Sequence, residues 1–88
     1  MSTEAAVSRD EIFNKVRDHL SAELELDPAE VGDGTRFRED LDADSLDLYE
    51  LVMELEDTYG IKMSEEEASK IETVGQAVDF VFTRLRGA

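Results

Sequence analysis

The sequence predicts an all-α fold: a four-helix bundle with three longer helices, one short third helix and a long first loop. Two observations predict it. Apolar residues recur at helical spacing in several stretches, and each stretch follows a residue that caps helices well. No stretch shows the convincing alternation of apolar and polar residues that is typical of a strand. With 88 residues, 41% of them hydrophobic, the chain can form one small domain.

The first helix is expected from about residue 9 to residue 25. Ser8 followed by Glu11 is the signature of a capping box, and residues 1–8 are expected to form a flexible leader. Apolar residues then keep helical spacing, at Ile12, Phe13, Val16, Leu20 and Leu24. His19 lies beside this stripe. The chain has one histidine and no cysteine, so His19 is expected to be a surface or helix-end residue rather than a ligand or catalyst.

A long irregular loop should follow the first helix. Asp27 and Pro28 predict a short turn, and residues 31–39 form an irregular connection. Loops of this length usually pack through a few apolar anchors, here Val31, Phe37 and Leu41. Arg36 and Arg38 are expected to tie this loop to acidic neighbours rather than to recognise phosphate.

The second helix begins next to a serine. Asp44 is a good N-cap, and Asp47, three residues later, can complete a capping arrangement. The amide groups and dipole of this helix start would favour a phosphate on Ser45. The same pattern also fits a serine that merely begins a helix, so on local sequence alone both interpretations stay open.

Projected at the helical repeat, residues 46–59 form three faces. The core face carries Leu48, Leu51, Val52, Leu55 and Tyr59. The opposite face is an acidic strip of Asp47, Glu50, Glu54 and Asp57. Between them, on the side of Ser45, lie Leu46, Tyr49 and Met53, with Glu56 at the edge. This second apolar stripe predicts either a docking surface for basic partners or a face covered by a neighbouring helix.

Two further helices complete the pattern. Gly60 is well placed to end the second helix. Ser64 begins a short third helix, with Ala68 and Ile71 on one side. Thr73 caps a last helix that reaches about Arg86. Its apolar stripe consists of Val74, Ala77, Val78, Val81, Phe82 and Leu85.

Composition narrows the possible functions. A net charge of -14 argues against nucleic acid and anionic membranes as partners. Without cysteine there is no disulfide and no thiolate metal site, and we expect no bound metal. No apolar run is long enough for a membrane segment, and no signal peptide is evident. We therefore expect a cytoplasmic location. We also expect a monomer.

The motif Asp44-Ser45-Leu46-Asp47, followed by Glu50-Leu51-Val52-Met53, resembles the acyl carrier proteins of dissociated (type II) fatty-acid synthesis. The resemblance runs through residues 9–86 in one register and implies an acyl carrier domain over 9–88. In this family a serine carries 4′-phosphopantetheine through a phosphodiester, and the thiol of this arm holds an acyl group as a thioester. The resemblance implies that Ser45 is the attachment site, with Asp44 beside it. The modified chain would be a phosphoprotein of lipid metabolism, and a carrier rather than an enzyme.

The resemblance also implies partners. A holo-acyl carrier protein synthase, or another phosphopantetheinyl transferase, would modify Ser45 with coenzyme A. Ketosynthases, reductases, dehydratases and acyltransferases would dock on the acidic second helix. Together with the helical projection, it predicts as partner contacts Leu46, Asp47, Tyr49, Glu50, Met53, Glu54, Glu56 and Asp57. An acyl chain is expected to enter beside the short third helix, between Val52, Leu55, Ile61, Met63, Ala68 and Ile71.

Some positions depart from the family pattern. Asp42 stands where glycine is common, Tyr49 where a smaller aliphatic residue is common, and Ser64 where proline is frequent. These departures concern the choice of partner rather than the serine chemistry. A discrete carrier of a polyketide pathway is the alternative within the same chemistry.

Two other classes of function fit the sequence less well. The spacing Asp40-x-Asp42-x-Asp44 resembles the start of a calcium-binding loop, but Ser45 and Leu51 stand where glycine and a bidentate glutamate are needed. An acidic calcium-binding or interaction module is therefore disfavoured. A catalytic Ser45 is rejected because there is no Gly-x-Ser-x-Gly elbow and the single histidine lies in another helix.

Overall fold

The computed structural model describes residues 7–86. Their helices are α1 (Arg9–Leu24), α2 (Ser45–Tyr59), α3 (Glu65–Ser69) and α4 (Val74–Leu85), with a 3-10 turn at Pro28–Glu30 between α1 and α2. Within this range the only β-type pairing is an isolated antiparallel bridge between Arg36 and Thr73. The predicted all-α fold, with three longer helices and one short third helix, is confirmed.

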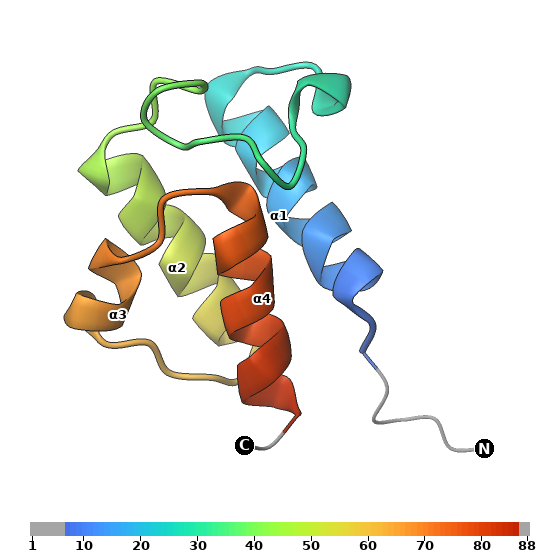
Figure 1. The fold of residues 1–88 in the computed structure, drawn as a ribbon, viewed down its shortest axis with the longest axis vertical. Helices are drawn as coiled ribbons and strands as arrows, with labels where there is room; N and C mark the ends of the chain where they lie inside the picture. The colour runs from blue at the N-terminus through green and yellow to red at the C-terminus, as the bar shows by residue number, and fades with distance from the viewer. Residues whose placement is uncertain (1–6, 87–88) are drawn as a thin grey trace.

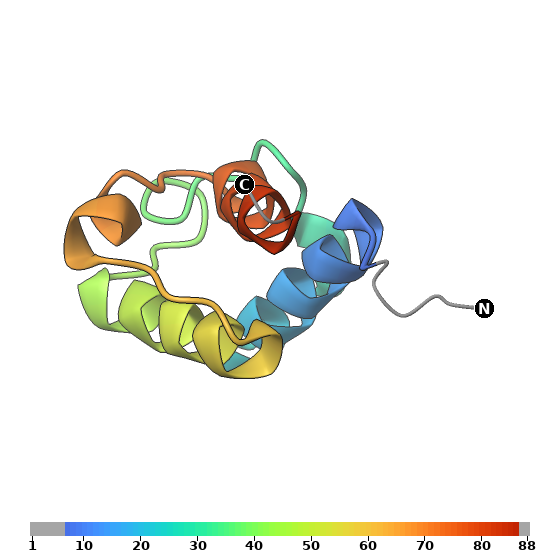
Figure 2. The same ribbon diagram turned by 90° about the horizontal axis from the view of Figure 1, so that it is seen from below.

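The helices surround a common core. α2 and α4 run in the same direction, and α1 runs opposite to both (Figure 1). The loop of residues 25–44 crosses the end of the bundle at which α1 ends and α2 and α4 begin (Figure 1). Figure 2, seen along the bundle, shows α1, α2 and α4 around the centre and α3 on the side away from α1. No described helix combines the length and the apolar character needed to cross a membrane.

The core is apolar throughout, and no polar or charged side chain of the described residues is buried in it. Each longer helix contributes one face, and α4 contributes Val74, Ala77, Val78 and Val81 at no more than 1% exposure. The predicted loop anchors Val31, Phe37 and Leu41 are buried, which confirms that the long loop is held by apolar contacts. Ala43 is also buried, next to the start of α2.

Every helix begins with a complete capping box. In each box the cap side chain accepts from the backbone N–H three residues ahead, and the side chain of that later residue accepts from the backbone N–H of the cap. The four caps are Ser8, Asp44, Ser64 and Thr73. Gly60 ends α2 in the left-handed conformation, as predicted, with φ of 68°. The C-cap of α1, Glu25, has φ of 57° without being glycine, which the sequence pattern did not indicate.

Residues 1–6 of the predicted leader lie outside the described residues. Of its last two residues, Val7 packs against the core and Ser8 caps α1. These two residues of the predicted leader therefore take part in the fold.

The long loop is fastened to the start of α4. The N–H groups of Phe37 and Val74 donate to the carbonyl oxygens of Glu72 and Thr35, at 3.0 and 2.9 Å. Gly75 N–H donates to Asp33 O at 2.8 Å, and a Cβ at Gly75 would come within 2.9 Å of that same oxygen. Only glycine permits this close approach. The loop that leads to Ser45 is thus anchored on the best-buried helix.

Candidate functional site

Ser45 is the first residue of α2, and its position is fixed by the cap before it. Asp44 Oδ1 accepts from Asp47 N–H at 3.0 Å, and Asp47 Oδ2 accepts from Asp44 N–H at 3.1 Å. The hydrogen bond from Asp47 N–H lowers the pKa of the Asp44 carboxyl. Ser45 is exposed. A rigid helix start therefore presents one serine hydroxyl to solvent.

A tight turn leads the loop to this serine. Asp42 N–H donates to Arg38 O at 3.1 Å, and Ala43 N–H donates to Phe37 O at 2.9 Å. Asp42 adopts a left-handed conformation with φ of 58°, which aspartate tolerates better than most residues. This conformation explains why glycine suits the position in the resembling family.

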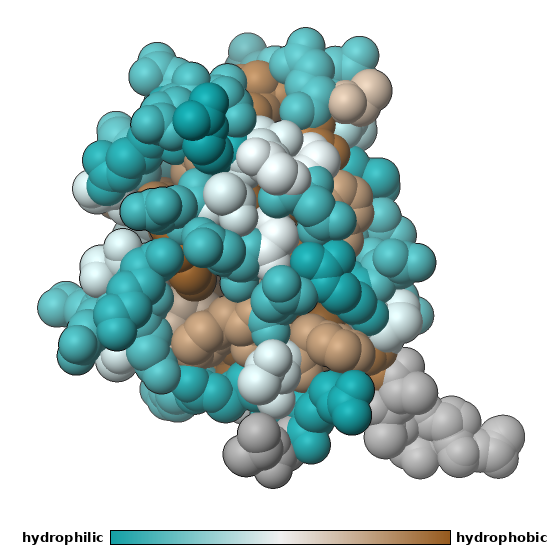
Figure 3. Space-filling model, viewed as in Figure 1, coloured by the Kyte–Doolittle hydropathy of each residue, from teal (hydrophilic) through white to brown (hydrophobic). Residues whose placement is uncertain are grey.

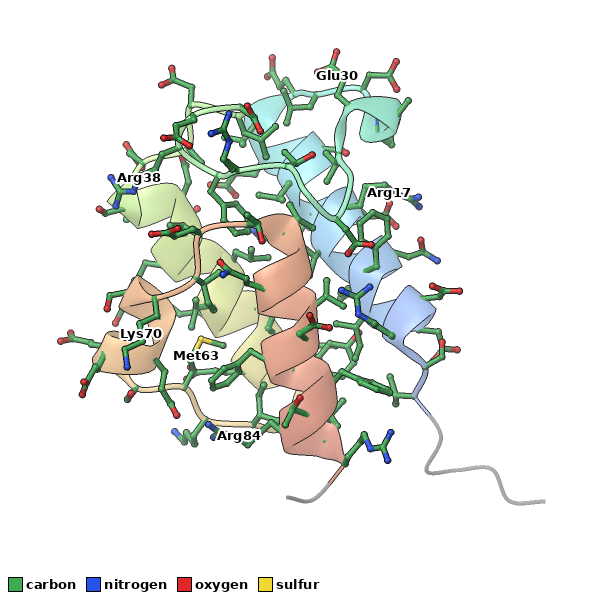
Figure 4. The ribbon with its side chains drawn as sticks, viewed as in Figure 1. Arg17, Glu30, Arg38, Met63, Lys70 and Arg84 are labelled. Atoms are coloured by element: carbon green, nitrogen blue, oxygen red, sulfur yellow. The ribbon has the colours of Figure 1, made fainter. Side chains whose placement is uncertain are left out.

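The same turn brings Arg38 to the serine. Its Nη2 donates to Ser45 Oγ at 2.8 Å, and Figure 4 shows Arg38 beside the first turn of α2. Arg36 instead pairs with Glu39 at 3.0 Å and Asp40 at 3.3 Å. The prediction that both arginines bind acidic neighbours is confirmed for Arg36 and wrong for Arg38.

A groove of about 390 Å³ opens beside Ser45, between α2 and α3. It is lined by Arg38, Ser45, Leu48, Tyr49, Val52, Met53, Glu56, Met63, Ser64, Glu65, Ala68 and Ser69. Figure 4 shows Met63 pointing toward the interior near α3. Apolar and thioether side chains at the base and polar ones at the rim suit a flexible aliphatic chain.

The predicted acyl-pocket residues divide into two groups. Val52, Met63 and Ala68 line the groove. Leu55, Ile61 and Ile71 do not line it and are buried in the core, at 1%, 8% and 8% exposure. In this arrangement the groove is lined by three of the six predicted residues, and the other three belong to the core.

The second apolar stripe of α2 is uncovered. Leu46, Tyr49 and Met53 are 62%, 54% and 52% exposed. Among the described residues no neighbouring helix covers them, so the alternative of a covered face is excluded within this range. They remain candidates for partner contact.

The acidic strip is less uniform than the helical projection predicted. Asp47 is engaged in the cap, and Glu54 pairs with Lys15 at 3.4 Å. Glu56, at the edge of the second apolar stripe, accepts from Met63 N–H at 2.8 Å. Glu50 and Asp57 are exposed. The charges best placed to act on another protein are therefore those of Glu50 and Asp57.

One acidic cluster was not predicted. Glu23 of α1 lies against α2 so that its carboxylate and those of Asp47 and Glu50 come within 4.8 Å of one another. Hydrogen bonding to Glu50, desolvation and the two neighbouring charges raise the pKa of Glu23 to about 7. His19 Nε2 lies 3.6 Å from Glu23 Oε1, and its side chain is only 20% exposed. His19 is therefore half-buried on α1 rather than fully exposed.

Two of the aspartates spaced as in a calcium-binding loop have other partners in the fold. Asp40 accepts from the backbone and guanidinium of Arg36, and Asp44 caps α2. Within residues 7–86 these two carboxylates do not belong to a group close enough to share a cation. The structure therefore gives no support to a calcium-binding loop here.

Comparisons with known proteins agree with this geometry. A family model described as a phosphopantetheine attachment site matches residues 14–81. An acyl carrier protein of Rubrobacter xylanophilus is 49% identical over 75 residues, which is 85% of this chain and 93% of that protein. One from Lactobacillus acidophilus is 44% identical over 75 residues, covering 85% and 94%. The solved acyl carrier protein of Enterococcus faecalis superposes with a TM-score of 0.76 at 40% identity, covering 88% of this chain and 98% of that one.

Proposed function

Because the chain belongs to the acyl carrier protein family, we propose that Ser45 carries its 4′-phosphopantetheine arm and that growing fatty acyl chains travel on this arm between the enzymes of fatty-acid synthesis. Acyl carrier proteins are carriers and not enzymes, and their prosthetic group is covalent. The arm supplies the thiol that this cysteine-free chain lacks.

The choice of Ser45 rests on how the serines of residues 7–86 use their hydroxyl groups. Ser8 and Ser64 accept from the backbone as caps, and Ser21 and Ser69 donate to backbone carbonyls. Ser45 is the exception, because its hydroxyl contacts only the guanidinium of Arg38. Ser64 also stands at a helix start beside the same groove, but its hydroxyl is used as the cap of α3, whereas that of Ser45 is not used as a cap.

In the transfer to Ser45, Oγ would form a bond to the β-phosphorus of coenzyme A. Adenosine 3′,5′-bisphosphate would leave, and the hydroxyl proton would pass to a base of the transferase. Ser45 has no positioned base of its own within the described chain, which is why a separate enzyme is needed.

The groove between α2 and α3 is the proposed seat of the acyl chain. Val52, Met63 and Ala68 supply its apolar surface. Burial of further methylenes would require α3 to move outward, exposing Ile61 and Ile71. This is feasible because α3 has five residues and none of them is buried.

Partner enzymes are proposed to dock on α2. Leu46, Tyr49 and Met53 would form the apolar centre of the interface, and Glu50 and Asp57 would steer basic surfaces toward it. The partners are a phosphopantetheinyl transferase and the ketosynthases, reductases, dehydratases and acyltransferases of the pathway. We place this monomeric carrier in the cytoplasm with them.

Docking can be tested by charge reversal. Glu50→Lys and Asp57→Lys should slow association with a ketosynthase and weaken its dependence on salt, since rim charges act mainly on the association rate. Glu30→Lys is the matched control, because Glu30 is exposed but lies away from α2 (Figure 4). Equal rates for all three variants would contradict the docking surface.

The attachment site is tested by intact-mass analysis after incubation with coenzyme A and a broad-specificity transferase. The wild type and Ser69→Ala should each gain one phosphopantetheine, and Ser45→Ala should gain none. Ser69 is a suitable control because it is exposed and lines the same groove. An unmodified wild type, or an adduct on Ser45→Ala, would overturn the proposal.

A further inference from the structure

Arg38 is an unusual arginine for so acidic a chain. The sequence holds 23 acidic residues, and yet Arg38 forms no ion pair with a carboxylate of residues 7–86. Its one hydrogen bond goes to a neutral acceptor, Ser45 Oγ, at 2.8 Å. The charge of the guanidinium and most of its N–H donors are therefore available to another group.

A phosphodiester on Ser45 would need such a cation. Asp44 and Asp47 lie on either side of this serine and would repel an anion. The first amides of α2 offer little compensation, because the Asp44 carboxylate already accepts from them. The sequence-based expectation that the helix start alone favours phosphate is therefore incomplete.

Arg38 has the position and the chemistry to supply the missing charge. Of residues 7–86 it is the only basic one that lines the groove beside Ser45. Its planar guanidinium can donate two parallel hydrogen bonds to phosphate oxygens. The non-bridging oxygens of a phosphoryl group on Oγ would lie next to Oγ itself, which Nη2 already contacts.

We propose that Arg38 is a positioning residue for the prosthetic arm, holding Ser45 Oγ in the unmodified chain and the phosphodiester oxygens once the arm is attached. No bond to Arg38 forms or breaks. The guanidinium neutralises the phosphodiester and directs the arm from Ser45 toward the groove. This inference rests on the proposal that Ser45 is the attachment site.

The test uses ³¹P NMR of the modified chain, with attachment first verified by mass. In the wild type, the ³¹P resonance should differ from that of the same modified chain unfolded in urea. Arg38→Ala should move the resonance toward the unfolded position, and Arg38→Lys should retain part of the difference because it keeps the charge. Arg36→Ala is the matched control, because Arg36 is an exposed arginine of the same loop that pairs with Glu39 and Asp40.

A second readout is the side-chain N–H signals of ¹⁵N-labelled arginine. Attachment of the arm should shift the Arg38 signals and leave those of Arg36 in place. If the wild type is modified but Arg38→Ala leaves the ³¹P resonance unchanged, the assignment of Arg38 is overturned and Ser45 stands. If the wild type gains no arm, the proposed function fails and this inference fails with it.

Discussion

α3 and α4 begin in the same way but are held very differently. Each starts with a complete capping box, at Ser64 and at Thr73. α4 then buries Val74, Gly75, Ala77, Val78 and Val81 over 12 residues, whereas α3 buries none of its five. Capping therefore decides where each helix starts, and burial decides how firmly it is held.

α3 also has open space on both sides. The groove beside Ser45 lies on one side of it, and a depression of about 400 Å³ separates it from α4 on the other. Figure 3 shows apolar side chains visible in this part of an otherwise largely hydrophilic face. An ion pair between Arg84 and Glu67, at 2.8 Å, links the two helices across the depression.

The charged contacts of α1 with α4 also differ from those of α1 with α2. Arg9 joins α1 to α4 through Asp79 at 2.6 Å and also binds Asp33 at 3.0 Å. Where α1 meets α2, Glu23 instead faces Asp47 and Glu50. Between α1 and α2 the ion pair of Lys15 with Glu54 therefore stands beside a cluster of like charges. Packing is weakest at α3, since none of its residues is buried.

The largest predicted effect is on α4. Val78→Ala should lower the free energy of unfolding by about 2–3 kcal/mol, because it removes two buried methyl groups and leaves a cavity. Ala68→Gly in α3 should cost about 1 kcal/mol or less, the ordinary helix-propensity cost. Urea denaturation measures both. Equal losses in the free energy of unfolding for the two variants would contradict the difference in anchoring between α3 and α4.

The caps allow a finer comparison. Thr73→Ala and Ser64→Ala each remove one cap, at a cost of about 1 kcal/mol to the helix concerned. In Thr73→Ala the loss should appear in global unfolding, because α4 forms part of the core. In Ser64→Ala it should appear as faster amide hydrogen exchange confined to residues 67–71. Faster exchange throughout that variant would show that α3 is as well anchored as α4.

The last effect concerns pH, and it is limited because Glu23 is exposed and solvent screens its charge. The pKa of Glu23 is raised from 4.5 to about 7 in the folded chain, chiefly by the hydrogen bond with Glu50. The folded state therefore binds the extra proton, and the stability this provides is fully present below about pH 4.5 and lost as the pH rises through 7. The stability of the wild type should fall relative to Glu23→Gln across this window. A difference in stability between these two proteins that does not change with pH would contradict the acidic cluster. Glu30→Gln changes a residue outside the cluster and should leave the dependence of stability on pH as in the wild type.

Much of the fold could be predicted because its signals are local. Capping residues and their partners lie three residues apart, so all four helix starts could be identified from the sequence. The anchors Val31, Phe37 and Leu41 were identifiable as the apolar residues of a polar loop. The exposed stripe of Leu46, Tyr49 and Met53 followed from helical periodicity, although only the structure excludes a covering helix within the described residues.

The missed features depend on the path of the backbone. Arg38 reaches Ser45 because the loop turns through Asp42 in a left-handed conformation and buries Ala43. Glu23 meets Glu50 because α1 and α2 pack together. Neither contact has a sequence pattern, since the partners lie on different elements. An aspartate where the family often has glycine was the one available signal for the turn.

We propose that the acyl chain enters the loosely held side of the bundle, between α2 and α3, while α4 stays fixed. The most direct measurement is a comparison of NMR shifts between the chain carrying the bare arm and the chain carrying an octanoyl thioester on it. We expect large changes at Val52, Met63 and Ala68, and little change at Ala77 and Val78. Unchanged signals along the groove, with the acyl chain left in solvent, would contradict it.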